Sequence, residues 1–373
     1  MKRWLVALER RGAAPSTAGW VALGVGLFCF LAGTNTLSGW LFAIAGLCWA
    51  LLAIAAIRVR QGAKGVTVQP LPIPPNRAGE KISISTDITN QGDRDRALFS
   101  LWPNLPAGLT LETVPAVATL TARQSQLLIL QANAPQRGVY EWAGWWIRTG
   151  APLGLWWYRR WLAAPGQAVV YPRSVPLATC PLLLAAAGRA ETSQTRLRTS
   201  YRDAAQGETR SLRPYRRGDA LRLVHWRSSA RYGELRSREL EMTGGKRPLA
   251  IAIDTTPGWQ SADFEQAAIA ATSIYLWSKR QEIELAMRTP SGEVRGDRSV
   301  LTALAAIQPD TPSASVPEVP VLWFTWNPQS LIGIAVDSYW FGWGRGFPRD
   351  GRGLCIDPSR DLRQQLQALP GSR

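Results

Sequence analysis

The sequence predicts a multidomain protein in which a two-helix transmembrane hairpin is followed by a β-sandwich and then by an α/β domain. Three observations predict this order. The stretch Gly12–Ile57 has no charged residue, residues 66–172 alternate apolar and polar side chains in short runs, and apolar strands alternate with helical patterns after Pro248. A chain of 373 residues has room for two or three domains of about 100–150 residues each. The predicted division is 1–64, 65–175, 176–247, 248–345 and a tail, 346–373.

The composition is strongly basic, with 43 Lys and Arg against 27 Asp and Glu and a net charge of +16. Such a charge favours anionic partners, which include phospholipid headgroups, nucleic acid and acidic protein surfaces, and it does not choose among them. Apolar residues make up 46% of the chain, so it can bury a core, and global disorder is excluded. Four cysteines without a CxxC pair and a single histidine argue against a structural zinc site or a disulfide framework, and they fit a reducing compartment.

The uncharged stretch near the N-terminus is long enough for two membrane spans, because a helix crosses the bilayer core with about 20 apolar residues. We expect spans at about residues 17–36 and 40–57, joined by the polar, glycine-bounded turn Gly33–Gly39. Basic residues flank both ends of the hairpin: Lys2, Arg3, Arg10, Arg11, Arg58, Arg60 and Lys64. The positive-inside rule therefore predicts a multi-pass protein of the inner (plasma) membrane whose bulk lies in the cytoplasm.

Two alternatives compete with this interpretation of the uncharged stretch. A cleaved signal peptide would have one shorter apolar region, so the second apolar span argues against it. A buried helical hairpin of a soluble domain is the other alternative, although helices that are apolar all round are rarely found in soluble domains.

The pattern of residues 65–175 favours short antiparallel strands. Runs such as Lys81–Ile88 alternate apolar and polar side chains, and turn clusters such as Asn90–Asp93 and Gln136–Gly138 separate the runs. This spacing predicts a sandwich of the immunoglobulin-like type, without the Cys–Trp–Cys arrangement of antibody domains. The region is rich in tryptophan, which favours a packed core, and Trp156–Trp161 is the best candidate for an exposed aromatic surface.

The segment between Arg189 and Arg247 carries 15 Lys and Arg against seven Asp and Glu, so it holds half of the chain's excess positive charge. Because opposite charges are interleaved, the arginines form either an internal ion-pair network or a cluster that binds an acidic partner. Asp219 follows Gly218 as a candidate helix N-cap. His225 is more simply a structural or exposed histidine than a catalytic one, because no nucleophile or set of ligands accompanies it.

This segment also contains a run of residues at fixed spacings. An acidic residue is followed by Leu-Arg-x-Tyr-x-x-Gly-Asp, an Arg three residues further on, a Trp and then Ser-Ala-Arg. The residues at these positions are Glu208, Arg213, Tyr215, Gly218, Asp219, Arg222, Trp226, Ser229 and Arg231. The run resembles the signature of the domain of unknown function 58 family. The resemblance covers roughly residues 66–289 and the two-span anchor, and it implies that these nine residues bind a partner or form a network of their own.

The C-terminal part alternates strands and helices. We expect strands at 248–254, 282–289, 321–324 and 332–336, and helices at 263–280, 300–307 and 358–369. A Gly- and Arg-rich stretch from Gly342 onward is predicted to be a surface loop, with contact to RNA as the alternative.

The family resemblance implies that this part is a von Willebrand factor A-like domain. In that class a strand ends in Asp-x-Ser-x-Ser, whose oxygens hold Mg²⁺. Here Asp254 and Thr256 match the first two ligand positions, while Gly258 lacks the last hydroxyl. The sequence therefore predicts at most an incomplete Mg²⁺ site, and the alternative is that Asp254 caps the turn that follows it. No other cofactor is expected.

The resemblance implies a role beside a MoxR-type AAA+ ATPase. We therefore expect a non-enzymatic, membrane-anchored adaptor or scaffold that acts with such an ATPase in assembly or activation of membrane or envelope complexes. The hairpin would contact membrane lipids, and no specific nucleic acid is expected. Binding of anionic lipid or nucleic acid through the basic segment is one alternative. The other is a hydrolase that uses Asp219 or Glu208 with His225, against which stand the absent nucleophile motif and the absent P-loop.

Overall fold

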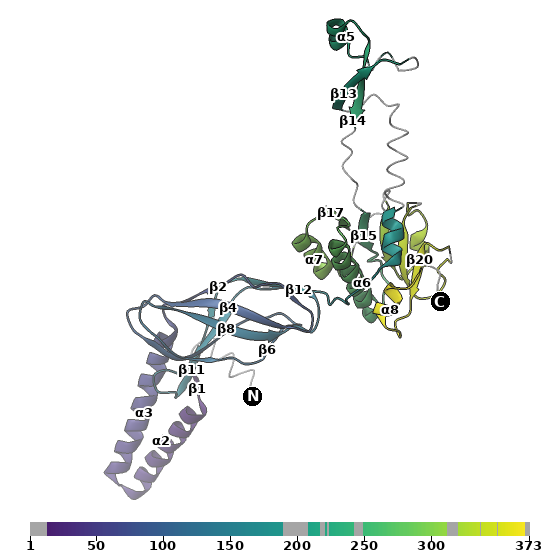
Figure 1. Cartoon of the computed structure of the whole chain (residues 1–373). Coiled ribbons are helices and arrows are strands. Elements are labelled where there is room, and N and C mark those ends of the chain that lie inside the picture. Colours follow the sequence, from purple (N-terminus) through teal and green to yellow (C-terminus); the bar gives the residue numbers. More distant parts are fainter. Residues whose placement is uncertain are drawn as a thin grey trace. The chain divides into compact units, whose positions relative to one another are not determined.

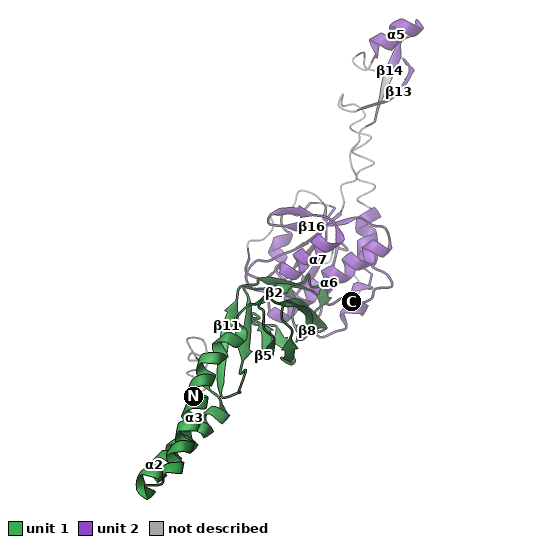
Figure 2. Cartoon of the chain, turned by 90° about the vertical axis from the view of Figure 1, so that its left-hand side faces the viewer, with its two compact units in different colours: residues 1–171 green, residues 172–373 purple. Residues whose placement is uncertain are grey.

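The computed structural model describes residues 13–188, 208–216, 221, 224–241, 249–311, 320–335, 337–348 and 350–369 (Figure 1). The chain divides into two compact units, residues 1–171 and residues 172–373 (Figure 2). The predicted boundary at residue 175 thus lies four residues beyond the division.

The first unit begins with two long apolar helices, α2 (Thr17–Thr36) and α3 (Gly39–Val59), followed by the short helix η1 (Arg60–Ala63). Ser16 caps α2, because its Oγ accepts a hydrogen bond from Gly19 N at 3.0 Å. Both helices are long and apolar enough to cross a membrane, and the predicted bounds agree with α2 and α3 to within two residues. The helices pack against each other through aromatic rings, with the Phe30 and Phe42 centroids 5.7 Å apart.

These two helices expose most of their apolar surface. In the most apolar 18-residue stretch of each helix, only 22% of α2 and 17% of α3 is buried against other parts of the protein. Phe28 is 71% exposed and Ile57 is 67% exposed. Contiguous apolar surface of this extent is unusual in a soluble protein and is typical of a helix that contacts lipid or another protein. The exposure argues against a buried helical hairpin of a soluble domain.

The remainder of the first unit is built from β-strands in three sheets. Their orders are β1-β11-β10-β5-β7, β2-β4-β8-β6 and β3-β12-β9, and every pair is antiparallel except β3 with β12. The strands are β1 (Ala14–Pro15), β2 (Val66–Pro70), β3 (Asn76–Arg77), β4 (Lys81–Asn90), β5 (Arg96–Pro103), β6 (Thr110–Leu111), β7 (Ala116–Leu120), β8 (Ser125–Asn133), β9 (Gly138–Trp142), β10 (Trp145–Thr149), β11 (Trp156–Leu162) and β12 (Gly166–Tyr171).

One core lies between these sheets. Alternation along β4 buries every second residue, including Ile82, Ile84 and Ile88. These side chains share a cluster with Phe99 of β5 and Trp145 of β10, which belong to a different sheet. Sheets that bury their inner faces against each other form a sandwich. The prediction of a β-rich region with several sheets is confirmed.

The hairpin is joined to the sandwich by backbone and side-chain contacts. β1 pairs with β11, and Ser16 N donates a hydrogen bond to Leu155 O at 2.9 Å. The Trp156 indole N–H donates to Leu52 O of α3 at 2.9 Å, and Arg160 donates to Ala63 O at 3.0 Å. β11 therefore contacts α3 near its C-terminal end and η1 directly after it.

The second unit contains a six-stranded sheet in the order β17-β16-β15-β18-β19-β20, parallel except for β17 at one edge. Its strands are β15 (Leu249–Ile253), β16 (Leu285–Thr289), β17 (Gly292–Val294), β18 (Val321–Thr325), β19 (Tyr339–Trp343) and β20 (Gly353–Ile356). Its helices are residues 181–188, α6 (Ser261–Arg280), α7 (Asp297–Ala306), η3 (Pro328–Leu331) and α8 (Leu362–Leu366). The alternation of strands and helices is the predicted α/β pattern.

Two parts of the sequence prediction for this unit are wrong. Of the strand expected at 332–336, the described residues 332–335 form no strand: Ile332 is 81% exposed and Gly333 has a φ of 95°, so the chain turns here instead. The expected tail, 346–373, contains the sixth strand and α8, and it contributes Leu354 and Leu366 to the core. The segment 176–247 likewise begins inside this core, with the helix at 181–188.

Candidate functional site

The signature residues lie on a small antiparallel pair of strands, β13 (Glu208–Pro214) and β14 (Arg236–Glu241), with the short helix α5 (Trp226–Tyr232) between them in sequence (Figure 1). Glu208 begins β13, Arg213 lies near its end, and Tyr215 N donates a hydrogen bond to Leu235 O at 2.8 Å. Three of the predicted residues, Gly218, Asp219 and Arg222, lie outside the described residues.

Helix α5 begins at Trp226, and its N-cap is His225. The imidazole Nδ1 of His225 accepts a hydrogen bond from Ser228 N at 3.2 Å, and the backbone N–H of His225 donates to Arg236 O at 2.8 Å. The imidazole of the chain's one histidine thus adds a second acceptor for Ser228 N, which also donates to His225 O at 3.0 Å at the start of the helix. This geometry supports the structural interpretation of His225 over the catalytic one.

Ser229 has a structural role as well. Its hydroxyl donates to His225 O at 3.1 Å and accepts from Arg236 N at 2.9 Å, and only 8% of the residue is exposed. These bonds hold α5 against the start of β14. The Arg236 guanidinium lies 4.1 Å from the centroid of the Tyr232 ring, which adds a cation–π contact between the same two elements. Ser229 is therefore part of the scaffold of the segment and not of its outer surface.

The outer surface of the segment combines aromatic, aliphatic and cationic side chains. Trp226 is 63% exposed, Tyr232 57% and Leu235 45%, and Arg231 is exposed as well. Within the described part of the segment, Arg227 and Arg231 form no ion pair with Glu234. Trp, Tyr and Arg are the residue types that contribute most to protein–protein interfaces, and this short segment exposes all three. We call the exposed side chains Trp226, Arg231, Tyr232 and Leu235 the signature surface.

A second candidate site lies where the chain order of the α/β sheet reverses, between β15 and β18, where ligands bind in many doubly wound folds. Asp254 follows β15 and is fully buried. One carboxylate oxygen accepts from Thr256 N at 3.0 Å, and the other accepts from the Thr325 hydroxyl at 2.7 Å. The Trp259 indole N–H donates to Asp254 O at 2.7 Å. We call this arrangement the Asp254 turn.

The Asp254 turn does not fit a Mg²⁺ site. Mg²⁺ needs a near-octahedral set of oxygens, and here the one acid already accepts two hydrogen bonds within the protein. The Thr256 hydroxyl is buried without a hydrogen-bond partner, so the motif adds one open hydroxyl to a single acid, far fewer ligands than Mg²⁺ needs. A Cβ at Gly258, the position of the third motif hydroxyl, would overlap the Trp326 ring. Among the described residues, no group of three or more His, Cys, Asp or Glu could hold a metal ion.

Tryptophan and arginine side chains contact one another on the outer face of β5, β10 and β11. The face consists of Trp102, Trp146, Arg148, Trp157, Arg159 and Trp161. The Arg148 guanidinium lies 4.1 Å from the Trp157 centroid, and the rings of Trp146 and Trp161 meet edge to face at 4.8 Å. Because strand residues alternate, Tyr158 and Arg160 lie on the opposite side of β11. Only part of the predicted aromatic surface is thus exposed: Trp161 is 37% exposed.

Comparison with known proteins adds little. No protein-family model matches the chain, and no curated protein matches its sequence. Among solved structures, alpha-2-macroglobulin of Salmonella is 18% identical with a TM-score of 0.23, and the match covers 31% of this chain and 7% of that one. The CARDB domain of a Pyrococcus furiosus protein is 9% identical with a TM-score of 0.18, covering 28% of this chain and 95% of the domain. The VesB protease of Vibrio cholerae is 14% identical with a TM-score of 0.20, covering 31% and 34%. Likenesses this weak carry no argument about function.

Proposed function

We propose that the chain is a non-enzymatic, membrane-anchored adaptor that binds a protein partner through its signature surface. The resemblance of the signature to the domain of unknown function 58 family makes a MoxR-type AAA+ ATPase the first partner to test. The observation that carries the proposal is the exposure of Trp226, Arg231 and Tyr232 on a segment whose buried residues, Ser229 among them, serve its own fold.

Anchoring by α2 and α3 in the inner membrane is part of the proposal. Support comes from two adjoining helices that are each long and apolar enough to cross a membrane and bury only 22% and 17% of their most apolar stretches against protein. Basic residues stand before α2 and after α3, which favours a multi-pass topology with both ends in the cytoplasm. The β-sandwich and the second unit then act on the cytoplasmic side of the inner membrane.

The finer fold assignments also belong to this proposal. The α/β sheet has the order 3-2-1-4-5-6 when its strands are numbered along the chain from β15, with an antiparallel third strand at the edge. This order, and an Asp at the end of the first strand, favour a von Willebrand factor A-like domain without a working metal site. The antiparallel sheets of the first unit favour an immunoglobulin-like sandwich.

A capture experiment tests the partner. Wild-type chain and two variants are used to recover proteins from detergent extracts of the source cells. Trp226→Ala removes the largest exposed side chain of the signature surface, and Ile332→Ala removes an exposed apolar side chain of the α/β unit. We expect the ATPase to be recovered with wild type and Ile332→Ala, and at least about tenfold less with Trp226→Ala, as for a truncated interface hot spot. Equal recovery of the ATPase by all three proteins, or by none, contradicts the proposal.

A further inference from the structure

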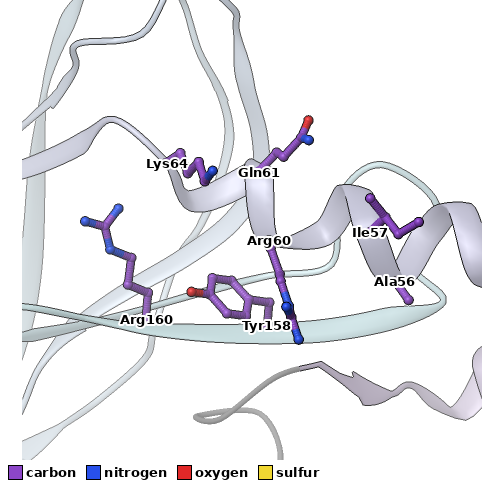
Figure 3. A pocket seen from close by; sticks show the side chains of 7 residues that line it. All are labelled: Ala56, Ile57, Arg60, Gln61, Lys64, Tyr158 and Arg160. Carbon is purple, nitrogen blue, oxygen red and sulfur yellow. The ribbon is translucent and has the colours of Figure 1, made fainter.

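A pocket of about 650 Å³ opens at the place where α3 ends beside β11 (Figure 3). Seven residues line it: Ala56, Ile57, Arg60, Gln61, Lys64, Tyr158 and Arg160. Three of them are cationic and none is acidic. The pocket thus concentrates positive charge in a concave site, whereas most surface arginines and lysines of soluble proteins project separately into water.

The secondary structure places these side chains together. Ile57 lies in the last turn of α3, Arg60 and Gln61 lie in η1, and Lys64 follows η1 with an extended backbone, so one short stretch of chain brings all four to the pocket. Tyr158 and Arg160 are two residues apart on β11 and therefore project to the same side of the strand. Arg160 also donates to Ala63 O at 3.0 Å, so its guanidinium is held in position by η1.

The lining changes from apolar to cationic along α3. Ala56 and Ile57 belong to the last turn of the apolar helix, and Ile57 is 67% exposed. Arg60 lies at the start of η1, Lys64 follows its end, and both side chains are exposed. A phospholipid has the same order of chemistry, with acyl chains next to a glycerol phosphate. Arg and Lys bind phosphate oxygens through charge-assisted hydrogen bonds, and a tyrosine hydroxyl can donate another.

We propose that this pocket binds the phosphate headgroup of an anionic phospholipid, whose acyl chains lie along α3 at Ala56 and Ile57. The inference rests on the proposed insertion of α2 and α3 in a membrane, which places the end of α3 at the level of the headgroups. The lipid neutralises Arg60, Lys64 and Arg160 where β11 contacts α3 and η1. It also fixes the sandwich against the membrane surface.

The adjacent residue Arg58 provides a matched control. Arg58 carries the same charge at the same end of α3, but it contacts Gln61 Oε1 at 3.5 Å and does not line the pocket. A cation that merely prefers the membrane interface would serve equally well at either position. A pocket that holds one lipid depends on Arg60 and Lys64 and not on Arg58.

The experiment uses the full chain in nanodiscs of phosphatidylcholine that contain increasing fractions of phosphatidylglycerol. Native mass spectrometry after release from the disc counts the retained phosphatidylglycerol molecules. We expect one retained molecule on wild type, about fivefold weaker retention for Arg60→Gln and for Lys64→Gln, and wild-type retention for Arg58→Gln. Equal losses in Arg58→Gln and Arg60→Gln, or no retained lipid on wild type, overturn the proposal.

Two further arms identify the source of the phosphate and separate this inference from the proposed function. Inorganic phosphate at millimolar concentration should not displace the lipid, because it lacks acyl chains for Ala56 and Ile57; complete displacement would assign the pocket to free phosphate. Carbonate washing of vesicles tests the anchor itself. If every protein is washed off, the proposed anchoring fails. If all proteins stay in the membrane and lipid retention is unaffected by Arg60→Gln and Lys64→Gln, only the lipid pocket fails.

Discussion

The Asp254 turn lies at the end of a strand, and the pocket lies at the C-terminal end of α3. Both are polar clusters, yet they are built in opposite ways. In the turn, a fully buried carboxylate accepts hydrogen bonds from Thr256 N and the Thr325 hydroxyl. In the pocket, Arg60 and Lys64 are exposed, and no acid is present in the lining to neutralise them.

This difference separates a structural cluster from a binding cluster. A buried charge must have its partners within the protein, because an unpaired one would cost several kcal/mol. Exposed cations that line one pocket without an acid keep their capacity to bind an anion from outside. The position of the Asp254 turn in the sheet favours a binding site, but its hydrogen bonds indicate that it stabilises the fold.

The largest effect that would sharpen this comparison is expected for Asp254→Ala. The change removes two hydrogen bonds to a buried carboxylate, one from Thr256 N and one from the Thr325 hydroxyl, although that hydroxyl still contacts Asn327 O and Ser330 Oγ. Hydrogen bonds to charged groups contribute about 1.5–3 kcal/mol each, so the α/β unit should lose about 3–5 kcal/mol of unfolding free energy. Cys180 reports on this unit: it is fully buried, and burial raises the pKa of its thiol to about 11. Its rate of alkylation at neutral pH therefore measures opening of the core.

The exposed thiol of Cys355 should react in the folded state, so its alkylation shows in the same sample that the reagent is active. Glu284→Ala, which removes an exposed carboxylate of the same unit, should leave the Cys180 rate unchanged. Protection of wild-type Cys180 by added Mg²⁺, lost in Asp254→Ala, would instead indicate that the turn binds the metal and would break the comparison.

Gly258→Ser is expected to have the next largest effect. The substitution restores the last hydroxyl of the Asp-x-Ser-x-Ser pattern, but the new Cβ overlaps the Trp326 ring and the residue has a φ of 117°. Overpacking and backbone strain together should lower the stability of the α/β unit by about 2–3 kcal/mol. Faster alkylation of Cys180 would show it. A variant as stable as wild type that gains Mg²⁺ binding would mean that the site is closed only by the missing hydroxyl.

Much of the fold was predictable because the decisive patterns are local. The spans at 17–36 and 40–57 correspond to α2 and α3, and the apolar run ending at Asp254 corresponds to β15. The strand β19 was missed because Tyr339–Trp343 leads into a glycine-rich stretch that favours a loop. Those glycines make room for rings: a Cβ at Gly342 would contact Phe347, and one at Gly353 would overlap Trp340. Packing of this kind joins residues that local periodicity does not relate.

The candidate sites were predictable only in part for the same reason. The basic segment was identified from its composition and spacing, but the role of Ser229 depends on Arg236, which joins it from the next strand. Arg60 and Lys64 were recognised only as charges that orient the hairpin. Their pocket also needs Arg160, which binds η1 from 97 positions further along the chain. The available signal was the alternation within Trp156–Trp161, which places Tyr158 two residues before Arg160.

A smaller effect is expected for charge removal in the pocket. Arg60→Gln should change the unfolding free energy of the first unit by no more than about 0.5 kcal/mol, because the side chain is exposed. Arg160→Gln loses the hydrogen bond to Ala63 O and should cost about 1 kcal/mol. Hydrogen exchange of peptides from η1 and β11 measures the loss of stability in each of the two variants. A loss in Arg60→Gln as large as that in Arg160→Gln would make the pocket a structural cluster like the Asp254 turn.

The smallest effect concerns an exposed polar cluster that lies between these extremes, at Asp297 in α7. Hydrogen bonds from Lys279 and then from Tyr275 lower the pKa of the Asp297 carboxyl below its usual value. A carboxyl with a lowered pKa in the folded state stabilises the protein above its unfolded pKa, near 4, and this stabilisation is lost as pH falls through the folded value. Because Asp297 is 59% exposed, solvent screening limits the contribution to a few tenths of a kcal/mol, about the size of a surface ion pair.

Hydrogen exchange in α6 and α7, corrected for intrinsic rates, should therefore increase slightly below about pH 4 in wild type. Lys279→Gln should already show the faster exchange at neutral pH and respond less to acid. An acid response of several kcal/mol that disappears in Lys279→Gln would mean that this exposed pair stabilises the unit as strongly as the buried Asp254 turn, and burial would no longer distinguish the two.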